Sequence, residues 1–152
     1  MGDIKIRPAV ISELPILREF EQGIIATERP FNECLKPEGI HYYDLGALIE
    51  SDKSIVMVAE DAGQIIASGY ARIRESKPHL IHDFHIYLGF MYVVESHRGQ
   101  GINQLIMEAL VLWGKKLGFE DFYLEAYADN RPALTAYEKM GFKPSLIEMK
   151  LS

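Results

Sequence analysis

The feature that most constrains this chain is a short glycine-containing turn, Arg98-Gly99-Gln100-Gly101-Ile102-Asn103. The apolar residues 90–94 before the turn are typical of a buried strand, and a helical pattern of apolar residues begins after it. The first amides of a helix lack intrahelical partners and lie at the positive end of the helix dipole, where they bind anions. The glycines let the backbone approach such an anion closely, and the arginine adds a fixed positive charge. The turn therefore predicts a phosphate-binding loop between a strand and a helix.

Two better-known phosphate loops do not fit this turn. A P-loop requires a Lys-Ser/Thr pair after its second glycine, whereas this chain has Ile102 and Asn103. A dinucleotide-binding loop requires a third glycine at the position of Gln104. A glycine turn that only starts a helix, without binding a ligand, stays open as the alternative.

Composition excludes several classes of protein. The 152 residues, 48% of them hydrophobic, suffice for one domain with a core, which we place at residues 1–152. There is no run of 18 apolar residues that would predict a membrane span, and residues 1–5 contain no apolar signal region. The single cysteine, Cys34, excludes an internal disulfide and fits a cytoplasmic protein. The net charge of −6 argues against nucleic-acid binding and fits a cationic substrate.

Hydrophobic periodicity predicts an alternation of helices and strands along the chain. The helices are expected at residues 12–27, 41–51, 101–117 and 130–140. The strands are expected at residues 3–7, 55–60, 64–73, 80–94, 121–127 and 146–151. This order predicts an α/β fold in which a mixed sheet carries helices on both faces.

Three segments in the second half of the chain resemble the GNAT superfamily of acetyl-coenzyme A-dependent N-acetyltransferases. Residues 91–101 are similar to the family's strand and pyrophosphate loop, and residues 124–133 to its next strand and helix start. Residues 137–142 are similar to its Tyr-x-x-x-Gly-Phe ending. The loop departs from the family pattern at Asn103, where the family has a small residue. On the ordered spacing of the three segments, the chain is identified as a member of the family.

The resemblance implies a mostly antiparallel twisted sheet in which two parallel strands splay apart at the cofactor site. A strand bulge near residues 91–93, opposite residues 122–126, would produce this splaying. Acetyl-CoA is the implied co-substrate, and no metal is implied. The implied cofactor-binding residues are Met91, Tyr92, Val93, Arg98, Gly99, Gln100, Gly101, Ile102, Asn103 and Asn130.

The resemblance also implies that an amine attacks the thioester directly. Tyr137 matches the family tyrosine that protonates the departing thiolate, a role that suits a group with an ordinary pKa of about 10. Glu125 stands twelve residues earlier and matches the glutamate that some protein N-terminal acetyltransferases of the family use as a base. A carboxylate that faces solvent or holds a loop is the alternative interpretation of Glu125. His82, Asp83 and His85 are the alternative bases.

The acceptor is expected to be a primary amine, but its kind stays open among a small amine, an aminoglycoside-like compound, a lysine and a protein N-terminus. Phe31, Tyr42 and Tyr43 either line the acceptor pocket or belong to the core. A different acyl donor, such as succinyl-CoA, would require basic residues that are not evident near residues 91–93. A non-catalytic acyl-CoA sensor is the alternative function. A homodimer is compatible with the sequence, whereas nucleic acid and membrane are not expected as partners.

Two further patterns are weak indications of chemistry. His79, His82 and His85 recur every third residue, which on a strand places neighbours on opposite faces and disfavours a metal site. Cys34 lies between Glu33 and Leu35, where nothing predicts a reactive thiolate.

Overall fold

The computed structural model describes residues 3–152; Met1 and Gly2, which begin the segment expected to contain no signal region, lie outside the described residues. The sheet has five strands in the order β1-β2-β3-β4-β5, antiparallel except for the parallel pair β4 and β5. The strands are β1 (Lys5–Pro8), β2 (Ser54–Asp61), β3 (Gln64–Glu75), β4 (Phe84–Val93) and β5 (Phe122–Tyr123). The helices are α1 (Leu14–Glu28), α2 (Leu45–Glu50), α3 (Ile102–Lys116) and α4 (Arg131–Lys139). The short 3-10 turns are η1 (Ile11–Glu13), η2 (Arg29–Phe31) and η3 (Glu95–His97).

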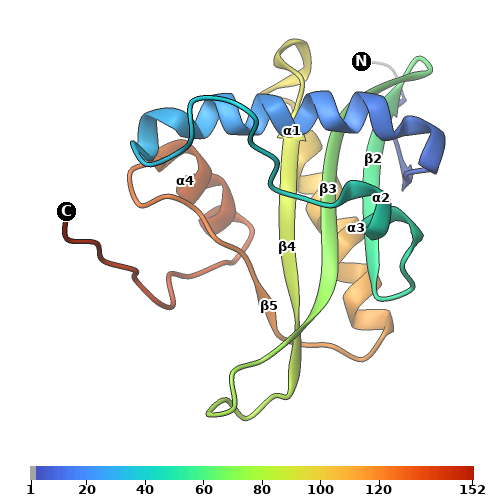
Figure 1. The fold of residues 1–152 in the computed structure, drawn as a ribbon. Coiled ribbons are helices and arrows are strands. Elements are labelled where there is room, and N and C mark those ends of the chain that lie inside the picture. Colours follow the sequence, from blue (N-terminus) through green and yellow to red (C-terminus); the bar gives the residue numbers. More distant parts are fainter. Residues whose placement is uncertain (1–2) are drawn as a thin grey trace.

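Helices cover both faces of the sheet, which confirms the predicted α/β fold class (Figure 1). α1 and α2 lie on one face and α3 on the other. Apolar residues three or four positions apart form the buried side of each long helix. The core residues of these sides are Leu17, Phe20 and Ile24 of α1 and Ile102, Ile106 and Leu110 of α3. Among the described residues, no helix is long and apolar enough to cross a membrane.

A β-bulge interrupts the pairing of β3 with β4. Ser68 pairs with Tyr92, but Tyr70 pairs with Gly89, so β4 has an extra residue at this point. Phe90 takes up the irregularity with a φ of 57°, a left-handed conformation that is unusual for a bulky side chain. The buried Ser68 hydroxyl donates a hydrogen bond of 3.0 Å to the Phe90 carbonyl. The bulge thus lies at the edge of the range predicted for it, residues 91–93.

The parallel strands β4 and β5 pair over a short distance and then diverge (Figure 1). Ile86 pairs with Phe122 and Tyr87 with Tyr123, and β5 ends there. This splaying confirms the predicted arrangement but shortens the strand that was expected at residues 121–127. The reason is physical: the chain diverges from β4 after Tyr123, so the following residues have no neighbouring strand to pair with on that side (Figure 1).

Three other predicted elements differ from the structure. The expected strand at residues 146–151 is absent: residues 143–152 form an irregular arm, on which Ile147 and Met149 are 75% and 89% exposed. The prediction of a strand is wrong because a strand also requires a partner strand, and the arm extends away from the sheet (Figure 1). The strand expected from residue 80 begins at Phe84, after a turn that leaves Ile81 fully exposed. The helix expected at residues 41–51 is only α2, which begins after Asp44 because that carboxylate caps the Ala47 amide at 3.2 Å.

Close packing at Gly69 leads to a stability prediction. A Cβ atom there would lie 2.6 Å from Ile106 Cγ2 and 2.7 Å from Met91 Sδ. We expect Gly69→Ala to lower the free energy of unfolding by about 1–3 kcal/mol, because the sheet and α3 would have to separate. Chemical denaturation measures this change. The matched control is Gly46→Ala in α2, where the new methyl group would meet nothing closer than 3.8 Å and alanine favours the helix. Equal stability of the two variants would contradict the prediction.

Candidate active site

The loop between β4 and α3 has the geometry expected of a phosphate-binding turn. Gly99 and Gly101 both have a φ of 78°, which L-residues rarely adopt, and Gly101 is the N-cap residue of α3. The Arg98 Nε donates a hydrogen bond of 2.8 Å to the Val93 carbonyl, and its guanidinium carbon lies 5.7 Å from the centre of the Tyr92 ring. Arg98 therefore holds the loop against the end of β4, and its remaining N–H donors are available to a ligand.

A histidine that the sequence did not single out anchors the same loop. His97 Nε2 lies 2.7 Å from Asp61 Oδ2 at the end of β2, and the two side chains are each about one-quarter exposed, at 22% and 23%. The His97 Nδ1 lies 2.8 Å from the Ser96 hydroxyl. This contact fixes the β4–α3 connection to the β2–β3 hairpin, 36 residues away in the sequence.

The end of β4 presents backbone groups to the space that β5 leaves. The Val94 amide donates to the Ile66 carbonyl at 2.9 Å, so the hydrogen-bonding groups of Val94 face β3. These groups alternate in direction along a strand, so those of Val93 and Met91 face away from β3. The Val93 N–H is thus turned away from β3, as the predicted cofactor site would require, whereas the Val93 carbonyl is already paired with Arg98 Nε. The Tyr92 side chain instead packs on α1, where its ring would meet a Cβ atom at Gly23.

Tyr137 lies on α4, which follows the point where β5 diverges from β4 (Figure 1). Asn130 begins this helix by accepting a hydrogen bond of 3.3 Å from the Ala133 amide, so the structure gives its side chain a capping role. Tyr137 packs against the core on the α3 side of the sheet, and its ring centre lies 6.2 Å from that of Phe142. Burial, and to a lesser degree the charge of Glu28, raise the pKa of Tyr137 to about 12. The hydroxyl therefore holds its proton throughout the neutral range.

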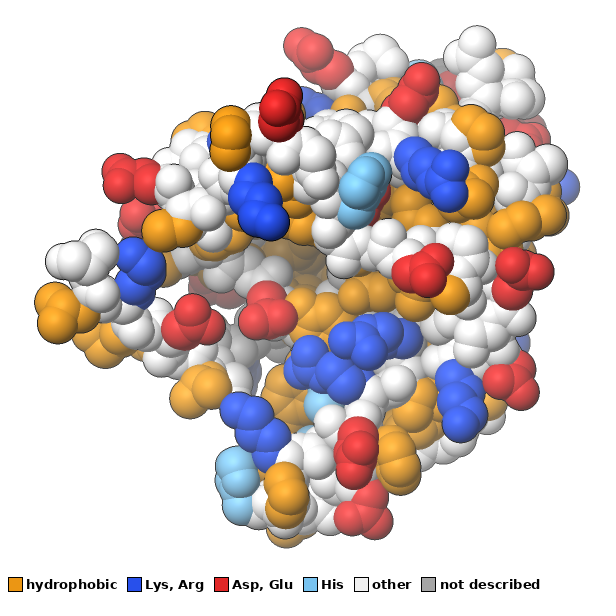
Figure 2. All heavy atoms as spheres, viewed as in Figure 1, with side chains coloured by type: hydrophobic (Ala, Val, Ile, Leu, Met, Phe, Trp, Pro, Cys, Tyr) orange, Lys and Arg blue, Asp and Glu red, His pale blue; other side chains and the backbone are white. Residues whose placement is uncertain are grey.

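Glu125 lies just beyond β5 and is exposed. Its Oε1 accepts a hydrogen bond of 2.6 Å from the Tyr87 hydroxyl of β4. The guanidinium carbon of Arg74 lies 4.1 Å from the centre of the same Tyr87 ring, and that of Arg72 lies 5.5 Å from it. Figure 2 shows a hollow in the surface of the molecule, with basic side chains gathered on one rim and acidic side chains nearby. Glu125 is thus held in a fixed position, and one of its oxygens already has a partner.

The histidines considered as alternative bases are engaged in a network of their own. The Ser76 hydroxyl lies 2.7 Å from His82 Nδ1 and 2.8 Å from His85 Nδ1. Arg74 Nε donates to His85 Nε2 at 2.9 Å, and His82 Nε2 lies 3.0 Å from the Tyr123 hydroxyl. Burial and the nearby Arg74 charge lower the pKa of His85, which favours its neutral form. Over residues 3–152, no group of three or more His, Cys, Asp or Glu side chains is arranged to hold a metal ion.

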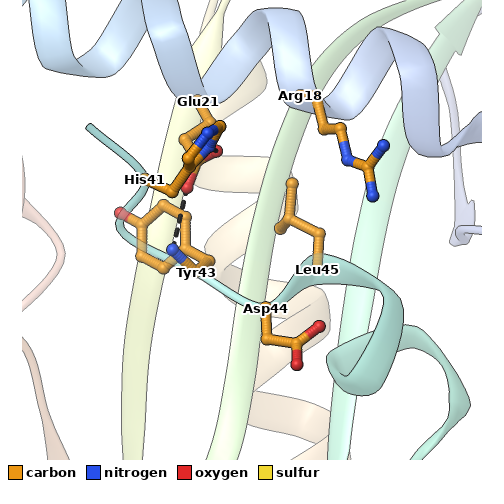
Figure 3. A pocket seen from close by; sticks show the side chains of 6 residues that line it. All are labelled: Arg18, Glu21, His41, Tyr43, Asp44 and Leu45. Carbon is orange, nitrogen blue, oxygen red and sulfur yellow. Dashed lines mark hydrogen bonds and ion pairs between the residues drawn. The ribbon is translucent and has the colours of Figure 1, made fainter. Parts of the chain in front are cut away.

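A surface pocket of about 430 Å³ lies between α1 and the segment before α2 (Figure 3). It is lined by Arg18, Glu21, His41, Tyr43, Asp44 and Leu45. None of these residues belongs to the loop, β5 or α4, so the pocket is separate from the predicted cofactor site. Its chief feature is Glu21, 1% exposed, which accepts hydrogen bonds from the Tyr42 and Tyr43 amides at 2.7 and 2.8 Å. Glu21 thereby fixes the segment that carries the two tyrosines.

The two tyrosines of this segment have different surroundings. The Tyr43 ring packs against Phe90 and Tyr70, with ring centres 5.3 and 5.4 Å apart, and belongs to the core. The Tyr42 hydroxyl faces the end of α1 and the segment after β5, as its proximity to Glu28 and Tyr127 shows. Glu28 had no sequence motif to mark it, since it is the last residue of an ordinary amphipathic helix. Cys34 is exposed and its amide donates to Asn32 Oδ1.

Comparison with known proteins shows to which protein family the chain belongs. The model of the acetyltransferase (GNAT) family matches residues 19–142, which is most of the chain. The match includes the loop, the splayed strands and Tyr137. The chain therefore belongs to the GNAT family, whose members are acyltransferases.

Curated relatives with sequence similarity are N-acetyltransferases. An N-alpha-acetyltransferase of Sulfurisphaera tokodaii is 28% identical over 119 residues, covering 74% of this chain and 70% of that protein. N-alpha-acetyltransferase 30 of Schizosaccharomyces pombe is 34% identical over 56 residues, covering 37% of each chain. The uncharacterized N-acetyltransferase YobR of Bacillus subtilis is 35% identical over 57 residues, or 38% of this chain and 23% of that protein. The chain thus matches well under two thirds of the length of the last two relatives.

Solved structures with the same fold cover nearly the whole chain. A variant of the BH1408 protein from Bacillus halodurans has a TM-score of 0.88 at 21% identity, over 97% of this chain and 98% of that one. An aminoglycoside antibiotic 6'-N-acetyltransferase from Acinetobacter haemolyticus has a TM-score of 0.76 at 20% identity, over 97% of both chains. A predicted acetyltransferase from Clostridium acetobutylicum, solved with acetyl-CoA, has a TM-score of 0.74 at 20% identity, over 99% of this chain and 96% of that one. At these identities the likeness establishes the fold.

Proposed function

We propose that this protein transfers an acetyl group from acetyl-CoA to a primary amine. One observation carries the proposal: the Val93 N–H, turned away from β3, directly precedes a phosphate-type loop, on a strand from which β5 diverges toward α4 with its protonated Tyr137. Coenzyme A has a pyrophosphate, an amide-rich arm and a thioester in that order. The loop suits the pyrophosphate, and the backbone groups of Met91 and the N–H of Val93 suit the amides of the arm. Tyr137 then stands at the thioester end.

The proposed chemistry is a direct attack. The neutral amine attacks the thioester carbonyl carbon, a C–N bond forms and the C–S bond breaks. The Val93 amide donates to the carbonyl oxygen while negative charge develops on it. Tyr137 gives its proton to the departing thiolate, because a phenol that is still protonated near neutral pH is a ready donor. The proton lost by the attacking nitrogen restores the tyrosine, directly or through water.

Glu125 is the proposed proton acceptor for the amine. An alkylamine is protonated near neutral pH, so it must lose a proton before it can attack. The exposed carboxylate is held by Tyr87 beside the opening between β4 and β5, where an amine can reach its free oxygen. This position also suits a structural carboxylate, and the pH dependence of the rate separates the two roles.

The test of the proposed function is a screen of primary amines with acetyl-CoA, in which the release of free coenzyme A thiol is measured. The panel consists of polyamines, aminoglycosides, lysine peptides and free N-terminal peptides. Thiol release that depends on one class of amine supports the proposal. Tight acetyl-CoA binding without turnover on any class would favour the acyl-CoA sensor instead.

Replacing the proposed base leads to a prediction about pH. We expect Glu125→Gln to lower the rate and flatten the acidic limb of the pH–rate profile between pH 6 and 9, since an amide accepts no proton. The matched control is Glu120→Gln, which removes an exposed charge from the loop before β5. A wild-type profile for Glu125→Gln would show that Glu125 is structural and leave His82, Asp83, His85 or solvent as the base.

A further inference from the structure

Side chains from three distant segments meet at the C-terminal end of α1. Asn32 Nδ2 donates a hydrogen bond of 2.8 Å to the Tyr127 hydroxyl, and the Phe31 and Tyr127 rings stack at 6.3 Å with 21° between their planes. The Tyr42 hydroxyl lies close to Tyr127 and Glu28. These contacts bring the loop after α1, the segment before α2 and the segment after β5 together, at the side of the molecule where α4 carries Tyr137 (Figure 1).

Glu28 is a partly buried carboxylate without a salt bridge. Burial raises its pKa, and the nearby Tyr42 hydroxyl offsets part of this rise. The next residue, Arg29, does not neutralise it, because its guanidinium donates to the Lys36 and Pro37 carbonyls at 2.8 and 3.0 Å. Within residues 3–152, no cationic side chain forms an ion pair with Glu28. A charge in this position is costly unless a ligand of opposite charge completes it.

The Tyr42 hydroxyl is a second incomplete group. It is buried and forms no hydrogen bond within the described residues. Buried polar groups are rarely left unpaired, because the loss of water costs about 1–3 kcal/mol without a replacement bond. The hydroxyl lies beside Glu28, so one cationic donor with several N–H groups would complete both. The cluster lies at the C-terminal end of α1, on the side of the molecule where α4 carries Tyr137 (Figure 1).

An alkylammonium group matches this cluster. It carries one positive charge and three N–H donors, enough for a carboxylate and a hydroxyl together. Aromatic rings such as those of Phe31 and Tyr127 attract cations to their faces. The net charge of −6 favours the approach of such a ligand.

We propose, on the basis of the proposed acetyl transfer, that Glu28, the Tyr42 hydroxyl and the Tyr127 ring form the subsite that binds the ammonium group of the acceptor. The acceptor is then an aliphatic primary amine that arrives protonated, and weakly basic aromatic amines are excluded. Binding through Glu28 places the nitrogen near the thioester end of the cleft. Transfer of the proton to the base follows as a separate step, after which the neutral nitrogen attacks.

Binding without chemistry tests the subsite directly. n-Butylammonium chloride is titrated into the protein saturated with coenzyme A and followed by amide chemical shifts, with 1-butanol as the neutral probe. We expect the ammonium to bind and the alcohol not to bind in the same concentration range. Glu28→Gln should weaken ammonium binding at least about tenfold, as expected for a charged hydrogen-bonding partner. The matched control, Glu33→Gln, removes an exposed carboxylate from the same loop and should bind as wild type does.

Several results would overturn the proposal. They are no binding of n-butylammonium to the wild-type protein, equal binding to Glu28→Gln, and an equal loss in Glu33→Gln. With an amine that the wild-type protein acetylates as the substrate, Glu28→Gln should raise the KM for that amine and leave kcat near the wild-type value. A loss in kcat alone would contradict a binding role. Failure of the amine screen alone would overturn the proposed acetyl transfer, because the titration does not depend on turnover.

A second variant separates a functional hydroxyl from a structural one. Tyr42→Phe removes a buried hydroxyl that has no partner, so we expect a Tm equal to or above that of wild type. The same variant should bind n-butylammonium about fivefold more weakly, the equivalent of about one neutral hydrogen bond. A lower Tm with unchanged binding would assign the hydroxyl a structural role and remove it from the subsite.

Discussion

Tyr137→Phe is expected to lower kcat by about 10²- to 10⁴-fold, the usual contribution of a positioned acid, while coenzyme A affinity stays nearly unchanged. The ring still packs against Phe142 and the core on the α3 side, so the cofactor site keeps its shape. Only the proton for the departing thiolate is lost. Steady-state kinetics give kcat, and calorimetric titration gives the coenzyme A affinity.

The pKa of Tyr137, raised to about 12, adds a prediction about pH. Because the hydroxyl stays protonated well above neutrality, its ionisation should not cause a fall in wild-type kcat between pH 8 and 10. The control for Tyr137→Phe is Tyr123→Phe, which removes a phenol hydroxyl that lies 3.0 Å from His82 Nε2 and has no role in the proposed protonation of the thiolate. If Tyr137→Phe turned over as fast as wild type, the tyrosine would be a packing residue, and water would protonate the thiolate.

Gly101→Val is expected to abolish the stabilisation that coenzyme A confers. At a hundredfold excess over its dissociation constant, a ligand adds about 2.7 kcal/mol to the stability of a protein. Valine at a φ of 78° is strained, and its side chain would occupy the space where the pyrophosphate approaches the helix amides. Thermal unfolding with and without millimolar acetyl-CoA measures the effect.

The control for this variant is Gly118→Val, at the opposite end of α3. Gly118 has a φ of 95°, and nothing lies within 4 Å of the position where a Cβ atom would stand. The control therefore carries similar backbone strain and lowers the Tm of the free protein, but it should keep the shift produced by acetyl-CoA. An unchanged Tm of the wild-type protein with acetyl-CoA would show that the loop binds no coenzyme A.

The elements that local chemistry dictates were predictable from the sequence. The turn at residues 98–103 begins a helix because two glycines can adopt a left-handed conformation there, and the structure shows both at a φ of 78°. Apolar spacing and N-terminal signals predicted helices α1, α3 and α4, and each observed helix begins and ends within two residues of its predicted bounds. The turn at residues 62–63 joins β2 to β3, in the gap between the strands expected at residues 55–60 and 64–73. Each of these features depends on neighbours in the sequence.

Pairing between strands was predicted less well, because it depends on partners that are remote in the sequence. The bulge requires Ser68 of β3 to hold the Phe90 carbonyl, and the end of β5 depends on where the chain diverges from β4. The alternating residues 146–151 have a strand pattern, yet no neighbouring strand lies beside them. A pattern shows which residues suit a sheet and not which strand will accept them.

The sequence by itself determined the family resemblance, the phosphate-type loop and the presence of Tyr137 and Glu125 at informative spacings. Only the tertiary structure decided which buried polar or charged groups lack partners. Glu28 and Tyr42 are separated along the chain from Tyr127 by 99 and 85 residues, and folding alone brings them together. An unpaired carboxylate or hydroxyl becomes chemically significant when it is buried. Burial depends on how the whole fold excludes solvent, so it cannot be predicted from a local stretch of sequence.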